Sequence, residues 1–307
     1  MCRLVAYAGP AVFLDRLLIE PPASLVSQSL AARESKTVVN GDGCGIGWYD
    51  ARPEPGLYRG VLPAWSDANL ASLCTQIRAR LFFAHVRSAT FGEVATANCH
   101  PFAAGRHLFM HNGQIGDYAR LRRCVDALIH DDHFPLRRGS SDSEAVFLAA
   151  LGRGLDDAPV AAFASVLADI VTQTGCAKPL RFAAVHSDGN GVWAYRWASD
   201  GHPPTLYWRR LGDGVVVASE PFDAMPDAWT EVPCGSALHI GREGVVRVAA
   251  FAPAQATARA ASGERLHGGR HQVDADGGQP DVGSDAGTGL NGALARWGAH
   301  GMNGASL

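Results

Sequence analysis

The sequence predicts two β-sheets packed face to face, with helices covering their outer sides. Short strand-like runs divided by Gly, Pro and Asp turns fill residues 181–251, and further strand patterns occur at 2–8, 81–87 and 107–111. Helical patterns fall into two blocks between these groups of strands. Because helices and strands do not alternate, a βαβ repeat is disfavoured and a layered α+β sandwich is favoured.

The N-terminal half is expected to begin with a strand that ends at Gly9-Pro10. Short helices are expected over 13–19 and 24–32. Ser66 is a suitable N-cap for a helix that runs to about Arg80, immediately before the next strand.

The run Asp42-Gly43-Cys44-Gly45-Ile46-Gly47-Trp48-Tyr49 predicts a tight turn that leads into a strand. Its glycine spacing is superficially that of a nucleotide-binding loop, but it precedes a strand instead of opening a helix, which disfavours phosphate binding. Later helices are expected near Asp117 and over 159–173, and Ser141-Asp142-Ser143-Glu144 has the form of a capping box that opens an apolar helix.

The composition is that of a soluble globular protein, with 307 residues, 47% apolar, 19% charged and a net charge of −3. Neither a nucleic acid nor a membrane is expected as a partner, because strong charge imbalance and an apolar run of about 20 residues are both absent from the sequence. The seven cysteines are scattered, which argues against a disulfide framework, a metal site or another cofactor. We expect a cytoplasmic protein, since the apolar run Leu4 to Leu14 is broken by Gly9-Pro10 and lacks a convincing cleavage site.

The last 55 residues differ in amino-acid composition from the rest of the chain. Residues 253–307 contain twelve glycines but only six Leu, Val, Ile or Phe residues. Such a segment cannot bury enough apolar surface to offset the entropy lost on ordering. We therefore predict one catalytic domain over 1–252 and a disordered tail over 253–307.

Cys2 is the first candidate for chemistry. If Met1 is removed, Cys2 carries a thiol and a free α-amine, and that amine titrates near 8, so it can accept the thiol proton at neutral pH. The alternative is that Cys2 is only a small apolar residue at the start of a strand.

Three further motifs offer groups that an acyl-transfer site requires. Asn112-Gly113 follows a strand and can supply a side-chain amide and a backbone N–H to an oxyanion, although Asn-Gly is also a common turn. Arg87 ends an apolar strand and can clamp a carboxylate, or it is simply a surface residue. Asp142 can pair with an ammonium group, or it serves only to stabilise the start of its helix. His100 follows a polar turn, and a structural role is the simpler interpretation for it.

In combination and order, these motifs resemble the class II glutamine amidotransferases. The resemblance rests on a set of short motifs and covers roughly residues 2–250: Met1-Cys2-Arg3, the Asp42–Trp48 turn, His85-Val86-Arg87, Asn98-x-His100-Pro101, His111-Asn112-Gly113 and Ser141-Asp142-Ser143-Glu144. It is strongest to small stand-alone members that hydrolyse γ-glutamyl amides. The resemblance implies a four-layer αββα sandwich of the N-terminal nucleophile hydrolase type.

The resemblance also implies a role for each matching residue. Cys2 attacks the γ-carboxamide and forms a thioester, while Asn112 and Gly113 stabilise the oxyanion. The substrate is held by Arg87, assisted by Thr90, at its α-carboxylate and by Asp142 at its α-ammonium group. His100 and His111 are expected to lie next to these residues.

Two departures from the family pattern concern pocket size. Ser88 follows the clamping arginine where many members have a bulky aromatic residue, and Cys44 stands where Phe is expected. Both changes predict room for a substrate larger than glutamine.

Several functions remain open from the sequence. A stand-alone hydrolase of a small-molecule γ-glutamyl substrate is favoured, and a glutaminase subunit that delivers ammonia to a separate protein is the nearest alternative. A thiol redox or metal-binding protein and a non-catalytic binding module are the other classes.

Overall fold

The computed structural model describes residues 2–35, 37–89, 92–174 and 178–253 of the chain. The predicted tail lies outside these residues from position 254 onward, and so does Thr90. The predicted boundary between a catalytic domain and a disordered tail stays a prediction.

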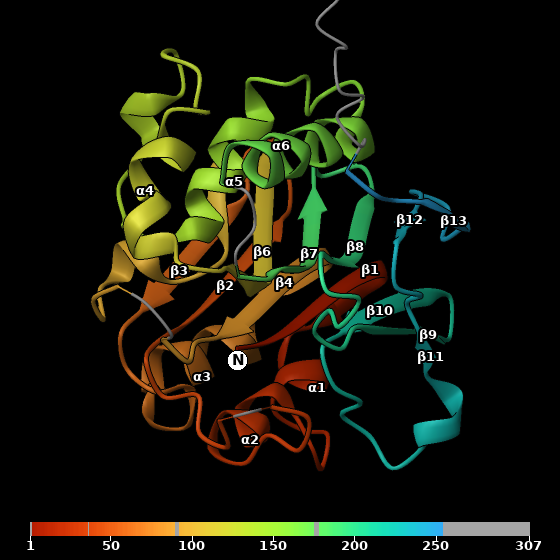
Figure 1. Ribbon diagram of the computed structural model, residues 1–307. Coiled ribbons are helices and arrows are strands. Elements are labelled where there is room, and N and C mark those ends of the chain that lie inside the picture. The colour runs from red at the N-terminus through yellow and green to blue at the C-terminus, as the bar shows by residue number, and fades with distance from the viewer. Residues whose placement is uncertain (1, 36, 90–91, 175–177, 254–307) are drawn as a thin grey trace, which may run out of the picture. The chain divides into compact units, whose positions relative to one another are not determined.

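Two sheets, antiparallel at every pairing in the described residues, make up the centre of the fold (Figure 1). The first has the order β11 (Thr230–Glu231), β9 (Tyr207–Leu211), β10 (Gly214–Ala218), β1 (Arg3–Phe13), β4 (Arg78–Val86), β2 (Cys44–Tyr49) and β3 (Gly56–Gly60). The second has the order β13 (Val246–Ala250), β12 (Ser236–Ile240), β8 (Val192–Ala198), β7 (Leu180–Ser187), β6 (His107–Ile115) and β5 (Phe102–Ala104).

Helices cover the outer face of each sheet, which confirms the predicted αββα layering (Figure 1). The first sheet is covered by α1 (Asp15–Leu18), α2 (Leu25–Leu30) and α3 (Ala68–Gln76). The second is covered by α4 (Tyr118–Asp126), α5 (Asp142–Leu151) and α6 (Pro159–Thr174). Short 3₁₀ turns connect these elements at η1 (Ala64–Ser66), η2 (Thr96–Asn98), η3 (Phe134–Leu136) and η4 (Pro226–Ala228).

Strand alternation decides which side chains enter the space between the sheets. Leu4 of β1, Phe83 of β4 and Leu108 of β6 are fully buried in the cluster that joins the two sheets. Their sequence neighbours Val5 and Phe109 instead pack against the outer helices. Because side chains alternate with a period of two, the same rule directs Cys2, His85 and Asn112 toward the space between the sheets.

The glycines of the Asp42–Trp48 motif allow the sheets to approach closely. A Cβ on Gly45 would lie 2.3 Å from the His100 carbonyl oxygen and 2.8 Å from that of Tyr58. A Cβ on Gly47 would lie 2.9 Å from the Leu108 side chain of the facing sheet. Close packing of backbone against backbone, and not phosphate binding, therefore explains this glycine pattern.

Four predicted boundaries in the N-terminal half were wrong. β1 continues through Gly9-Pro10 to Phe13, because a register shift between Ala8 and Val12 accommodates these residues. The N-cap of α3 is Asp67 and not Ser66, because the Asp67 carboxylate accepts hydrogen bonds from two N–H groups of the first turn. The helix ends at Gln76, so β4 begins earlier than predicted.

We predict that Gly45→Ala destabilises the protein by about 1–3 kcal/mol, because the added methyl group meets two carbonyl oxygens that belong to backbone. The free energy of unfolding from denaturant titration measures this effect. Gly241→Ala is the matched control, since its Cβ would meet no atom closer than 3.8 Å. Equal stability of the two variants would show that the sheets do not constrain this position.

Candidate functional site

Cys2 lies at the start of the central strand β1, with its sulfur against the chain that follows β4. The Ser88 N–H donates to Sγ at 3.3 Å, and the thiol donates to the Ser88 carbonyl at 3.5 Å. Burial raises the pKa of the Cys2 thiol, while the Ser88 N–H and the charges of Arg87 and Arg3 oppose the rise. The sulfur is thus held by backbone contacts and has two cations nearby.

Arg87 is almost fully buried at the end of β4 and is tied to two loops. Its Nη1 donates to the Glu93 carbonyl at 3.2 Å and to the Asp42 carbonyl at 3.5 Å. The Asp42 carboxylate in turn accepts from the Ala89 N–H at 2.7 Å. The interpretation of Arg87 as a surface residue was wrong, because its guanidinium lies in a buried corner next to Cys2.

Asn112 is 1% exposed on β6, and neither polar atom of its amide has a hydrogen-bond partner in the described part of the chain. A buried amide without partners is uncommon and suggests a ligand that completes it. The following Gly113 has a φ of 150°, and a Cβ there would lie 2.0 Å from the Arg181 carbonyl oxygen. Glycine is therefore required at this position, which lies within β6 and not in the Asn-Gly turn considered as an alternative.

Asp142 is the first residue of α5, and both of its carboxylate oxygens are oriented by backbone. Oδ2 accepts from the Ile115 N–H at 2.9 Å and Oδ1 accepts from the Ser143 N–H at 2.8 Å. The carboxylate lines a hollow of about 280 Å³ whose wall also includes Gln114 and Lys178. Asp142 is thus fixed against the end of β6, at Ile115, which lies two residues beyond Gly113.

The predicted capping box is only half formed. The Ser141 hydroxyl accepts from the Glu144 N–H at 3.2 Å, as the motif predicts. The Glu144 carboxylate does not return to Ser141 but accepts from the Arg138 and Gly139 N–H groups and pairs with Arg137 at 2.6 Å. It holds the loop that precedes the helix.

His111 lies on the helix-covered side of β6, with its imidazole connected to Asp142 through Ser143. Its Nε2 lies 3.2 Å from the Arg181 carbonyl and therefore donates, and its Nδ1 lies 2.9 Å from the Ser143 hydroxyl. Burial lowers the pKa of His111, so it is neutral at physiological pH. The imidazole supports the strand that carries Asn112 and does not face Cys2.

His100 and His85 form a buried pair with ring centroids 4.2 Å apart. None of their four ring nitrogens has a hydrogen-bond partner in the described residues. Burial lowers the pKa of His85 to about 3 and that of His100 well below its ordinary value. Asn112 lies close enough to oppose the fall for His85, although the two side chains do not meet hydrogen-bond geometry.

Sequence reasoning placed Cys44 near the substrate, and the structure corrects this. Its buried sulfur lies 3.6 Å from the Asp67 carboxylate, on the side of the sheet that the helices cover. Ser88, by contrast, contacts Cys2 directly, and its hydroxyl lies 3.0 Å from that of Thr37. Of the two small residues, only Ser88 borders the nucleophile.

The cysteines bear on the thiol redox and metal-binding alternatives. All six described cysteines are free, and no group of three or more His, Cys, Asp or Glu side chains there is placed to hold a metal ion. None of the described helices combines the length and hydrophobicity that a bilayer crossing requires.

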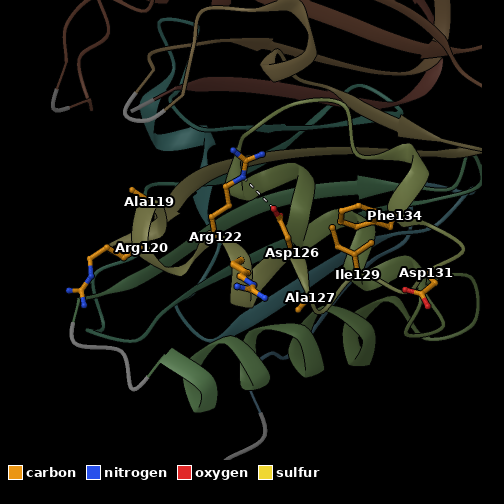
Figure 2. A pocket seen from close by; sticks show the side chains of 9 residues that line it. Ala119, Arg120, Arg122, Asp126, Ala127, Ile129, Asp131 and Phe134 are labelled. Carbon is orange, nitrogen blue, oxygen red and sulfur yellow. Dashed lines mark hydrogen bonds and ion pairs between the residues drawn. The ribbon is translucent and has the colours of Figure 1, made fainter. Parts of the chain in front are cut away.

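A hollow of about 820 Å³ lies elsewhere, between α4 and the loop after it, with Arg122, Asp126 and Phe134 in its wall (Figure 2). None of the predicted site residues lines it. The candidate site is therefore defined by the chemistry around Cys2 and not by the volume of this hollow.

Comparison with known proteins gives a consistent result. The family model of class-II glutamine amidotransferases matches residues 18–202. The γ-glutamyl-hercynylcysteine sulfoxide hydrolase of Mycobacterium tuberculosis is 31% identical over 252 residues, which cover 81% of this chain and 97% of that protein. The probable glutamine amidotransferase DUG3 of Saccharomyces cerevisiae is 35% identical over 156 residues, which are 48% of this chain and less than half, 44%, of the yeast protein.

Solved structures agree on the fold. A glutamine aminotransferase class-II domain protein from Silicibacter pomeroyi has a TM-score of 0.66 and 37% identity, with 82% of this chain and 100% of that one covered. The glutamine phosphoribosylpyrophosphate amidotransferase of B. subtilis has a TM-score of 0.55 at 16% identity, with 82% of this chain and 49% of that one covered. The latter likeness concerns the fold alone.

We predict that stability falls as the pH drops below about 6.5, the ordinary pKa of histidine. The pKa values of His85, His100, His111 and His186 are lowered by burial, so the unfolded chain binds protons that the folded chain does not. Their stabilisation is complete above the unfolded pKa and is lost as the pH falls toward the folded value. For His85, with a pKa of about 3, this is about 2 kcal/mol between pH 6.5 and 5.

Denaturant titrations at pH 7.5 and pH 5 measure this loss. His100→Gln is expected to reduce the difference in unfolding free energy between the two pH values, and substitution of the exposed His202 by Gln is the control that leaves it unchanged. Stability that stays constant or rises toward pH 5 would contradict neutral buried imidazoles.

Proposed function

Because this chain belongs to the class-II glutamine amidotransferases, enzymes that act on carbon–nitrogen amide bonds, we propose that it hydrolyses the amide of a γ-glutamyl compound through the Cys2 thiol. The observation that carries this proposal is the position of Cys2. Its sulfur lies against the backbone of Ser88, next to the buried guanidinium of Arg87, and the residue directly precedes the central strand.

Activation of the sulfur is proposed to come from the cysteine's own amine. Burial alone raises the pKa of the thiol and disfavours the thiolate, so a base is required. The buried imidazoles of His85 and His100 have lowered pKa values, which makes them weak bases. Removal of Met1 would expose an α-amine on the same residue as the thiol, which can accept its proton.

The substrate is proposed to be fixed at both ends of its amino-acid part. Arg87 supplies a cation for the α-carboxylate, and a planar guanidinium matches a carboxylate geometrically. Asp142 supplies an anion for the α-ammonium group, and the two backbone N–H groups on its oxygens leave further acceptor sites. A role for Thr90 in this clamp stays a prediction, because it lies outside the described residues.

The unpaired amide of Asn112 and the backbone N–H of Gly113 are proposed to stabilise the oxyanion. An amide that has no partner among the described residues is available to donate when negative charge develops on the substrate oxygen. Such donors act mainly on the transition state, and loss of one typically costs about 10²–10³-fold in rate.

The proposed reaction has two steps, which are formation of a thioester and its hydrolysis. The Cys2 sulfur adds to the γ-carbonyl, its proton passes to the α-amine and then to the departing amine, and a γ-glutamyl thioester forms. Water, with the α-amine as proton acceptor, adds to the thioester carbon. The C–S bond breaks, the γ-carboxylic acid leaves, and the released thiolate takes back the proton from the α-ammonium group.

The substrate class is proposed to be a small γ-glutamyl metabolite. The mycobacterial relatives of this chain, which match over most of their length, are named as γ-glutamyl-hercynylcysteine sulfoxide hydrolases. The small Ser88 beside the nucleophile favours a leaving group larger than ammonia, as the sequence predicted. A separate protein that accepts ammonia is then not required.

We predict that Cys2→Ala abolishes hydrolysis of a γ-glutamyl amide, by more than about 10³-fold in kcat, because the nucleophile is lost. Steady-state turnover of the isolated protein measures this. Cys124→Ala is the matched control, since Cys124 is exposed and lies outside the site. A γ-glutamyl electrophile is expected to label Cys2 alone, as peptide mass spectrometry of the treated protein would show.

Retained activity in Cys2→Ala, or labelling at another cysteine, would refute the nucleophile. An unaltered protein that is silent alone but active after addition of a partner protein would support the glutaminase-subunit alternative. A higher kcat/KM for glutamine than for a bulky γ-glutamyl amide would refute the proposed substrate class.

A further inference from the structure

Glu220 carries a buried carboxylate in the segment after β10, with 2% of its surface exposed. Both of its oxygens accept from the Arg33 N–H at 3.1 Å, and Oε2 also accepts from the Glu34 N–H at 3.0 Å. A buried carboxylate is costly unless it is paired and hydrogen-bonded. Here it holds the backbone of Arg33 and Glu34.

The charge partner of Glu220 is the residue that follows the nucleophile. Arg3 is fully buried, and its Nη1 lies 3.5 Å from Glu220 Oε2. Its Nε donates to the Cys2 carbonyl at 2.7 Å, and its Nη1 also donates to the Ser219 carbonyl at 3.4 Å. Burial lowers the pKa of Arg3, and the charge of Glu220 opposes this fall. The Glu220 carboxylate therefore holds the Arg3 guanidinium in place, and this guanidinium donates a hydrogen bond to the backbone carbonyl of Cys2.

The sulfur side of Cys2 is bordered by Ser88, whose backbone contacts the sulfur. The Thr37 hydroxyl lies 3.0 Å from that of Ser88, and the Asp42 carboxylate accepts from the Ala89 N–H at 2.7 Å. Among the described residues, Glu220 reaches Cys2 through Arg3.

We propose that Glu220 is a positioning residue for the Cys2 nucleophile, acting through Arg3 on the Cys2 backbone. The inference rests on the proposed function of Cys2. Since attack on a carbonyl tolerates little misplacement, loss of this carboxylate reduces the rate of thioester formation while the substrate clamp, which Glu220 does not contact, is kept.

The test is Glu220→Gln, which preserves the shape of the side chain but removes its charge. We expect kcat for a γ-glutamyl amide to fall by about 10- to 100-fold, with KM changed by less than about threefold. Glu231→Gln is the matched control, because it breaks an ion pair with Arg196 of 2.7 Å at a half-exposed position of β11. Its kcat and KM are expected to stay unchanged.

An unchanged kcat in Glu220→Gln, or a raised KM with kcat unchanged, would overturn the proposal. If Glu220→Gln fails to fold, Glu220→Asp provides the test, because its shorter carboxylate cannot hold Arg3 and the Arg33 N–H together. A lowered kcat at an unchanged Tm supports the role, and a kcat equal to that of the unaltered protein overturns it.

Covalent labelling separates this outcome from failure of the proposed function. A γ-glutamyl electrophile is expected to modify Cys2 in Glu220→Gln at the same residue as in the unaltered protein, but more slowly. Equal labelling rates overturn the positioning role. Absence of Cys2 labelling in the unaltered protein refutes the proposed nucleophile itself.

Discussion

The antiparallel pairing of β1 with β4 is the interaction on which the candidate site depends. Its register sets Arg3 opposite Val86 and Leu4 opposite His85, so that Cys2 comes to the end of β4 where Arg87 and Ser88 follow. A slip of one residue would turn every side chain of β1 to the other face of the sheet. The apolar residues of β1 oppose such a slip, since Leu4 belongs to the inner core and Val5 to the outer one.

The candidate site lies where the paired ends of β1 and β4 meet buried polar residues between the two sheets. His85, His100 and Asn112 carry buried polar atoms that have no hydrogen-bond partner among the described residues, and burial lowers the pKa values of the two imidazoles. Asn112 lies on β6, and Ile115 at the end of that strand donates its N–H to the carboxylate of Asp142, the first residue of α5. Under the proposed function, Arg87 and Asp142 are the charged groups that bind a zwitterionic substrate, and the neutral Asn112 is a donor for its amide.

Much of this arrangement was predictable because the relevant signals are local in sequence. The strands are visible as an alternation of apolar residues along the chain. Cys2, Arg87, Gly113 and Asp142 each stand in a short motif that can be found in the sequence. Glu220 was not predictable, since its partners Arg3 and Arg33 lie about 190 to 220 positions away in the chain. Cys44 was misplaced because its motif does not reveal which face of β2 a side chain occupies, and that depends on pairing with β3 and β4.

The most direct test of the central claim is the intact mass of the active protein. The Cys2 amine can serve as the base only if the initiator methionine is absent, so we predict a mass lower than that of the full 307-residue chain by one methionine residue in preparations that turn over a γ-glutamyl amide. Full specific activity in protein that retains Met1 throughout would contradict the claim, because the α-amine would then belong to another residue.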